Sequence, residues 1–207
     1  FRRIHRRLYS PAVFLGEDYA MPISTQPFDR YFWNADASAA IPYFETEEAQ
    51  LKIVRVASTC PSINVHWIDA CWYRDTFRKG TGNYSYSPGF PNGMRSISDA
   101  AHEAGMNFMV WFEPARANTG TEAYMRFHDD PKKLIQTGGK SHLMNLGDDD
   151  VRAWVYDNIV RVMEDSNIDF YRQDYNIDPI ELLRAIDEPG RKGIAEMRFL
   201  EGMYRLW

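Results

Sequence analysis

The segment from Ile168 to Asn176 reads Ile-Asp-Phe-Tyr-Arg-Gln-Asp-Tyr-Asn and contains the residue types best suited to covalent chemistry. Its pattern predicts a short buried strand that delivers Asp174 at its C-terminal tip. Side chains alternate along a strand, so Arg172, Asp174 and Asn176 would project to one face. A cation and an amide would then flank the carboxylate and keep it ionised and oriented, as a carboxylate nucleophile requires.

Two further carboxylates stand at the ends of apolar runs. Asp69 closes the run that begins at Asn64, and Glu113 follows the apolar run that begins at Met106. In a barrel of alternating strands and helices, active sites are built at the rim formed by the C-terminal ends of the strands. We therefore expect Asp69, Glu113 and Asp174 to lie on one rim.

Amphipathic segments separate the expected strands. Helices are expected from Thr46 to a stop at Cys60-Pro61, over 98–104, 122–128 and 193–207, and from Asp148 through Met163, with one more strand over 30–33. Solid apolar strands that alternate with such helices favour a parallel sheet covered by helices. About four strand–helix units are visible, roughly half of the eight in a closed barrel. The predicted fold class is α/β, a partial (β/α) TIM-type barrel that forms roughly the first half of the barrel.

The composition narrows the class of protein. Of the 207 residues, 44% are hydrophobic and 26% are charged, which is typical of a globular chain. A net charge of −5 gives no reason to expect a nucleic-acid partner, and apolar stretches of a few residues cannot span a bilayer. The five histidines and two cysteines show no metal-ligand spacing, and no glycine-rich phosphate loop follows an expected strand.

Three segments carry a family resemblance. They are Trp67-Ile68-Asp69-Ala70-Cys71-Trp72, the series from Phe90-Pro91-Asn92-Gly93-Met94 through Gly105-Met106 to Trp111-Phe112-Glu113-Pro114, and Arg172-Gln173-Asp174-Tyr175-Asn176. The first is similar to a strand that ends in Asp-Asp-Gly-Trp. The second is similar to a Phe-Pro-x-Gly, Gly-Met and Trp-Phe-Glu-Pro series, and the third to Lys-Trp-Asp-Met-Asn. Together and in this order they resemble glycoside hydrolase family 36, the melibiase-type α-galactosidases, and more loosely family 27.

The resemblance implies roles for the residues of the third segment. Asp174 matches the family's nucleophilic aspartate. Arg172 stands where the family usually has a lysine that contacts the sugar, and Asn176 matches the asparagine after the nucleophile. An exchange of lysine for arginine is not neutral, because a planar fork replaces a point donor.

The resemblance also implies residues that bind the sugar. Asp69 matches the first of two aspartates that hold hydroxyls on the far side of the ring, and the second position is Ala70 in this chain. Trp33 and Trp111 match tryptophans that line the sugar pocket. Ala115 stands where many members carry a second acidic residue.

The implied chemistry is retaining hydrolysis of an α-glycoside by two carboxylates, with neither metal nor cofactor. Asp174 would form a covalent glycosyl-enzyme, and a second carboxyl roughly 5–5.5 Å away would protonate the leaving oxygen and then activate water. In the family this second residue is an aspartate on a strand well downstream. We expect it beyond Trp207, because Asp178 is too near in sequence. The expected partner is an α-linked oligosaccharide or galactoside, without nucleic acid or membrane.

The ends of the chain bear on its organisation. It begins without methionine and ends abruptly within a helical pattern, so it looks like an excised piece of a longer protein. Residues 1–25 are expected to be the exit from an upstream domain and a lead-in, and 26–207 the N-terminal half of a truncated catalytic barrel. Half a barrel has two open parallel edges, so we expect this segment alone to be insoluble or molten. The full-length protein could form a homo-oligomer.

Other interpretations stay open from the sequence. A near alternative is an α-N-acetylgalactosaminidase or another α-glycosidase of the same clan, and a more distant one is a catalytically inactive carbohydrate-binding barrel. A metal-dependent barrel hydrolase would use Asp69, Glu113 and Asp174 as ligands. Among the single residues, Asp174 could form only a structural ion pair with Arg172. Glu113 could simply fix a backbone turn, and Trp111 could be a core residue.

Overall fold

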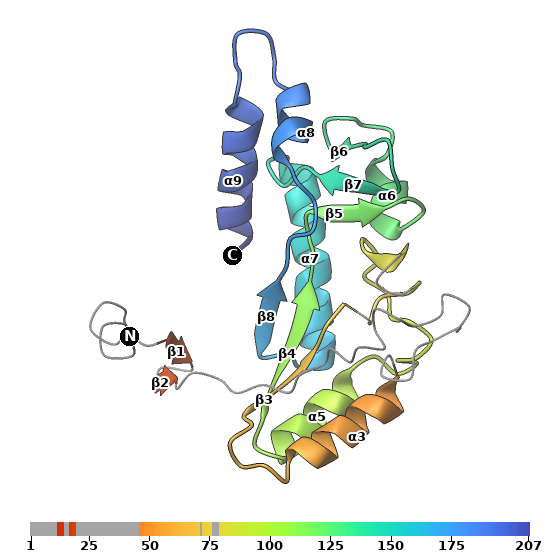
Figure 1. Cartoon of the computed structure of the whole chain (residues 1–207), viewed down its shortest axis with the longest axis vertical. Helices are drawn as coiled ribbons and strands as arrows, with labels where there is room; N and C mark the ends of the chain where they lie inside the picture. The colour runs from red at the N-terminus through yellow and green to blue at the C-terminus, as the bar shows by residue number, and fades with distance from the viewer. Residues whose placement is uncertain (1–11, 15–16, 20–45, 71, 76–78) are drawn as a thin grey trace.

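A computed structural model describes residues 12–14, 17–19, 46–70, 72–75 and 79–207. Its centre is a parallel sheet with the strand order β3-β4-β8, formed by Val65–Ile68, Asn107–Phe112 and Phe170–Gln173 (Figure 1). A second sheet is antiparallel, with the order β5-β7-β6 from Arg116–Asn118, Ser141–Met144 and Leu134–Ile135. Near the start of the chain, β1 (Ala12–Phe14) pairs with β2 (Glu17–Tyr19) in antiparallel fashion.

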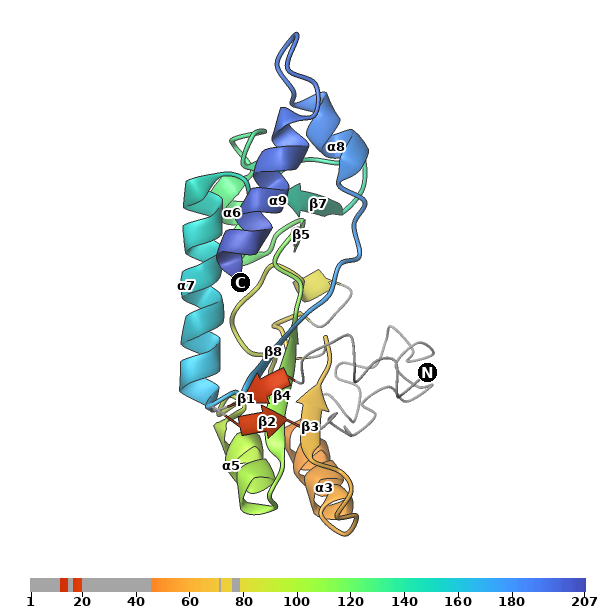
Figure 2. The same ribbon diagram turned by 90° about the vertical axis from the view of Figure 1, so that its left-hand side faces the viewer.

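Helices pack against both sheets. Those of the described residues are α3 (Glu47–Ala57), α5 (Arg95–Glu103), α6 (Glu122–Phe127), α7 (Asp149–Ser166), α8 (Ile180–Ala185) and α9 (Ile194–Leu206). α3 and α5 lie side by side at one end of the parallel sheet, and α7 runs beside β4 and β8 (Figure 1, Figure 2). None of the described helices is long and apolar enough to cross a membrane.

Side chains cap the starts of α3 and α7. The Thr46 side chain accepts a hydrogen bond from the backbone of Ala49 at the start of α3. Asp148 accepts from the backbones of Asp150 and Val151 at the start of α7. The predicted apolar face of α7 is confirmed, since Val151, Val155, Ile159 and Val162 are buried in the core.

The register of the parallel sheet brings the ends of its strands to one edge. Ile68 pairs with Val110, and Trp111 pairs with Arg172. The next residues along the chain after β3, β4 and β8 are the three predicted carboxylates, Asp69, Glu113 and Asp174. The prediction that these residues follow parallel strands at a shared edge is confirmed.

Some sequence predictions were wrong. The antiparallel sheet β5-β7-β6 was missed, because strands of two to four residues show no usable periodicity. The short helix α8, which follows Asp174 along the chain, was not predicted from the sequence. β8 is half-buried and not buried as expected, because it is an edge strand of the described sheet. The expected strand over 30–33 lies outside the described residues.

The backbone of α9 at Gly202 lies directly against the backbone of Leu146, in the loop before α7. A Cβ built on Gly202 would overlap the carbonyl oxygen of Leu146 and lie 2.6 Å from its carbonyl carbon. The approach therefore requires glycine, although glycine costs a helix interior up to about 1 kcal/mol relative to alanine. The neighbour is backbone and cannot rotate away, so steric overlap outweighs helix propensity here.

We expect Gly202→Ala to destabilise the complete gene product by about 1–3 kcal/mol, the usual cost of overpacking. Gly138→Ala is the matched control, because no atom lies within 4 Å of a Cβ built there. The control should change the free energy of unfolding by less than about 0.5 kcal/mol. Urea unfolding of both variants measures the difference, and equal stabilities would contradict the proposed backbone contact.

Candidate active site

Asp174 is held by three hydrogen-bond donors immediately after β8. Its Oδ2 accepts hydrogen bonds from Trp111 Nε1 at 3.0 Å and from Asn176 Nδ2 at 3.1 Å. Its Oδ1 accepts from the backbone N–H of Tyr175 at 2.8 Å. The backbone N–H of Asp174 donates to the carbonyl of Phe112, the last residue of β4, at 2.9 Å. The carboxylate therefore has a fixed position at the end of the sheet.

The surroundings of Asp174 favour its ionised form. Burial alone would raise the pKa of this carboxyl, yet the pKa lies below its ordinary value. The hydrogen bonds from Trp111, the Tyr175 backbone and Asn176 stabilise the anion, and together they outweigh burial. The positive charge of Arg172 lowers the pKa further. An ionised, oriented carboxylate is the state that a nucleophile requires.

Arg172 is oriented by an aromatic ring. Its Cζ lies 4.5 Å from the centroid of the Trp67 indole, so the guanidinium reaches across β4 to a side chain of β3. Stacking of this kind contributes up to about 2 kcal/mol when desolvated. Arg172 Nη1 is buried without a hydrogen-bond partner in the described part of the chain. Among the described residues no ion pair joins Arg172 to Asp174, and the charge of Arg172 acts on this carboxylate from a longer distance.

Asp69 presents an unused acceptor at the same edge. It is 5% exposed, and its Oδ1 accepts a hydrogen bond from the backbone of Ala70 at 2.7 Å. Its Oδ2 is buried and has no partner among the described residues. Burial raises the pKa of Asp69, and the negative charge of Asp174 adds to this, against the Ala70 hydrogen bond and the charge of Arg172. A buried, unpaired carboxylate oxygen is costly unless a ligand supplies a donor.

Trp111 is a core residue that also contacts the candidate nucleophile. Its side chain is in the core, the residue is 1% exposed, and its carbonyl accepts a hydrogen bond from Trp72 Nε1 at 2.9 Å. The indole reaches the site through the N–H that it donates to Asp174. The expectation that its aromatic face lines a sugar pocket stays a prediction. Trp33, the other expected pocket residue, lies outside the described residues.

Glu113 points into the protein and is fully engaged there. It is 2% exposed and binds Arg116 through two contacts, Nε to Oε1 at 2.8 Å and Nη2 to Oε2 at 2.5 Å. Its Oε1 also accepts from the backbone of Asn176 at 2.8 Å. This geometry favours the turn-fixing interpretation. No group of three His, Cys, Asp or Glu side chains suited to a metal ion occurs in the described segments.

Two residues of the site were not singled out as partners from the sequence. Arg116 binds Glu113, and its only signal in the sequence is an arginine three residues after Glu113. Trp67 orients Arg172, and its signal is an aromatic residue two positions before Asp69, on a strand that β4 separates from β8. The contact of Trp67 with Arg172 joins segments that are far apart in the sequence, so only the fold reveals it. Glu113 and Arg116 are three residues apart, and the sequence does not show that both side chains are buried.

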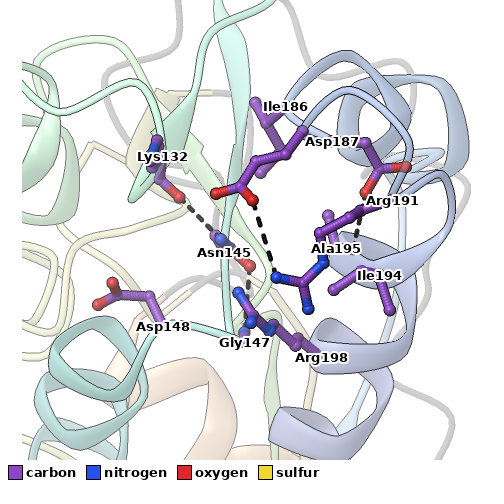
Figure 3. A pocket seen from close by; sticks show the side chains of 11 residues that line it. Lys132, Asn145, Gly147, Asp148, Ile186, Asp187, Arg191, Ile194, Ala195 and Arg198 are labelled. Atoms are coloured by element: carbon purple, nitrogen blue, oxygen red, sulfur yellow. Dashed lines mark hydrogen bonds and ion pairs between the residues drawn. The ribbon is translucent and has the colours of Figure 1, made fainter.

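A separate pocket of about 160 Å³ lies between α8, α9 and the loop before α7 (Figure 3). Basic residues such as Arg191 and Arg198 and acidic residues such as Asp148 and Asp187 line it. Asp187 in this pocket accepts from the backbones of Gly193 and Ala195 at the start of α9. None of the predicted site residues lines this pocket, and it is distinct from the candidate active site.

Removal of the Trp111 hydrogen bond should change how activity depends on pH. In Trp111→Phe the Asp174 carboxylate loses one donor, so its pKa should rise and the acid limb of kcat/KM should move to higher pH. A hydrogen bond to a charged group contributes about 1.5–3 kcal/mol. At pH values below the acid limb, kcat/KM of the variant should therefore fall about tenfold or more relative to the wild type. Trp154→Phe on α7 makes the same change away from Asp174 and should leave the limb in place. Identical limbs in both variants would contradict the role of Trp111.

The fold and the site together define a class of protein. The chain is an α/β protein in which ionisable side chains meet at the C-terminal edge of a parallel sheet. The sequence pattern of the Melibiase family matches residues 35–207. Because this match covers most of the chain, the protein belongs to the melibiase family, and the resemblance drawn from the three motifs is confirmed.

Relatives and solved structures agree with this assignment. The chain is 25% identical over 174 residues to the alpha-galactosidase Mel36A of Lactobacillus acidophilus, a match that covers 79% of this chain and 23% of that protein. It is also 25% identical to the alpha-galactosidase AgaA of Geobacillus stearothermophilus, over 79% of this chain and 24% of that one. The chain thus spans about a quarter of the length of these curated relatives.

The solved structures support the fold. The structure of the GH36 alpha-galactosidase AgaA from Geobacillus stearothermophilus matches with a TM-score of 0.67 at 23% identity, over 78% of this chain and 23% of that one. A variant of AgaA in complex with stachyose matches with the same TM-score at 21% identity, also over 78% and 23%. The mixed α/β architecture is therefore shared with these enzymes.

Proposed function

We propose that the complete gene product containing this chain is a retaining α-galactosidase that cleaves terminal α-linked galactosyl residues. Asp174 is its nucleophile, and the hydrogen bonds that keep this carboxylate ionised at a strand end carry the proposal. Attack by an Asp174 oxygen on the anomeric carbon forms the glycosyl–enzyme ester as the leaving oxygen departs. The matched relatives are named alpha-galactosidases, which supports the proposed hydrolysis of α-galactosides.

The proposal gives each neighbour of Asp174 a task. Asp69 Oδ2 and Arg172 Nη1 are unpaired in the described chain, one an acceptor and the other a donor, and both suit ring hydroxyls. Trp111 and Asn176 orient the nucleophile. The substrates we propose are α-galactosyl oligosaccharides, and the structures of related AgaA variants in complex with stachyose and with raffinose support this choice.

The proposed architecture extends the fold described above. We propose that residues 26–207 form the N-terminal half of a (β/α) barrel and that 1–25 lead into it from a preceding domain. The sequential order β3-β4-β8 of parallel neighbours supports this, because a barrel adds its strands in chain order. Since the relatives are about four times as long, we propose that the general acid/base carboxyl lies outside these residues.

The test is hydrolysis of four substrates by the complete gene product. 4-nitrophenyl α-galactoside should be turned over, and the α-N-acetylgalactosaminide, α-glucoside and β-galactoside should be poor substrates. Preference for the α-N-acetylgalactosaminide would replace galactose as the proposed sugar. Sugar binding without turnover of any substrate would favour a carbohydrate-binding protein and overturn the proposed activity.

A further inference from the structure

Glu113 and Arg116 form a buried ion pair close to the candidate nucleophile. Glu113 follows β4 and Arg116 begins β5, so the pair closes the turn between the two sheets. The side chain of Glu113 is 0% exposed and that of Arg116 is 9% exposed. Both oxygens of Glu113 accept from the guanidinium, in the bidentate form that fixes geometry most firmly.

Stability alone does not account for such a pair. Desolvation of two charges is expensive, and apolar side chains of similar volume often stabilise a fold equally well or better. The pair Arg184–Glu181 on α8 has the same spacing, and its side chains are 43% and 82% exposed. A buried pair in the turn beside the site therefore points to positioning.

Contacts lead from this pair to the nucleophile. Glu113 Oε1 accepts the backbone N–H of Asn176 at 2.8 Å. The side chain of the same asparagine donates to Asp174 Oδ2 at 3.1 Å. Without an acceptor at Glu113, the Asn176 backbone N–H would be left without this partner. The loop would then be free to shift, and the Asn176 side chain would leave Asp174.

We propose that Arg116 and Glu113 are positioning residues that hold Asn176, and through it Asp174, in the geometry needed for nucleophilic attack. This inference rests on the proposed function. Arg116 acts by holding Glu113 with both oxygens turned inward, and Glu113 acts by accepting the Asn176 backbone. Neither residue contacts the substrate.

The charged and titratable groups around the two carboxylates are few. Asp174 faces Arg172 from its own strand and Asp69 from the end of β3. Glu113 faces Arg116 from β5, the hydroxyl of Tyr73, which its backbone contacts at 3.3 Å, and Tyr175. Burial keeps both tyrosines neutral by raising their pKa, so they do not titrate in the working range.

Two double variants of the complete gene product isolate the acceptor. Glu113→Gln with Arg116→Met removes both charges and keeps one carbonyl oxygen for the Asn176 backbone. Glu113→Leu with Arg116→Met removes the charges and the acceptor. Apolar replacement of a buried pair is commonly tolerated, so both variants should fold. The measurement is the pH dependence of kcat/KM for 4-nitrophenyl α-galactoside, with thermal unfolding recorded alongside.

The Gln variant should lose about threefold in kcat/KM at pH values below the acid limb, and its limb should shift less than that of the Leu variant, because it keeps an acceptor for the Asn176 backbone without the Arg116 fork that orients it. The Leu variant should lose about tenfold below the limb, and its limb should move to higher pH, because Asp174 loses the Asn176 donor. The exposed pair changed to Glu181→Gln with Arg184→Met is the control and should behave as wild type. Equal acid limbs in the Gln and Leu variants, whatever their melting temperatures, would overturn the inference.

A Leu variant that fails to fold and an inactive wild type each have a defined consequence for the inference. If the Leu variant does not fold, Arg116→Lys replaces it, since lysine keeps the charge and loses the fork. A shift of the acid limb to higher pH, smaller than the shift expected for the Leu variant, supports the positioning role of Arg116 and Glu113. An unshifted limb overturns it. If wild type turns over no α-galactoside, the proposed function fails first and the inference falls with it. If the wild type is active and the acid limbs of the variants do not shift, the inference is overturned and the proposed function stands.

Discussion

Asp174→Ala is expected to lower kcat for 4-nitrophenyl α-galactoside by about 10⁴–10⁶-fold in the complete gene product, the range found when catalytic side chains are removed. The variant has no oxygen to attack the anomeric carbon, so no glycosyl–enzyme forms. Trp111 and Asn176 would keep their places and donate to solvent instead of the carboxylate. Initial rates with wild type and variant measure the loss.

A small anion can then distinguish the removal of a nucleophile from general damage. Azide fits the space left by the carboxylate, and its attack on the anomeric carbon expels nitrophenolate and yields a β-galactosyl azide. The control Asp178→Ala changes a nearby carboxylate that accepts from the Ile180 backbone at 3.1 Å, and it should keep activity within a few-fold of wild type. Turnover that survives Asp174→Ala without azide would mean that another residue is the nucleophile.

The parts of the fold that were predictable have strong and local signals. β3 and β4 are continuous apolar runs, and α7 combines an aspartate cap with an apolar face. The positions of Asp69 and Glu113 after a strand followed from these two runs. The short strands β5, β6 and β7 were not predictable, because pairing between distant segments defines them and no local periodicity announces them.

The direction of each side chain at the site was harder to predict than its place in the chain. The contact of Asn176 with Asp174 follows from alternation along one segment, and it was expected. Glu113 stands at the same edge yet turns inward, because Arg116 approaches from β5, a strand that the sequence did not reveal. Likewise the indole of Trp111 is in the core and only its N–H serves Asp174.

Asp69→Asn should cause the next largest loss, about 10²-fold in kcat/KM, which corresponds to about 2.7 kcal/mol of transition-state stabilisation. The Oδ1 acceptor for the Ala70 backbone survives in asparagine, so the loop should stay in place. The unpaired Oδ2 becomes an amide that donates and cannot accept from a ring hydroxyl. Steady-state kinetics and a thermal melt separate this loss from unfolding.

Substrate analogues identify the bond that Asp69 makes. With 4-nitrophenyl α-galactosides in which one ring hydroxyl at a time is replaced by hydrogen, wild type should lose most on the analogue whose missing hydroxyl donates to Asp69. Asp69→Asn should lose little more on that analogue than on the parent sugar, because the interaction is already absent, while other deoxy analogues should lose as in wild type. Additive losses on every analogue would mean that the buried Oδ2 of Asp69 holds no hydroxyl and that its burial has a structural cause.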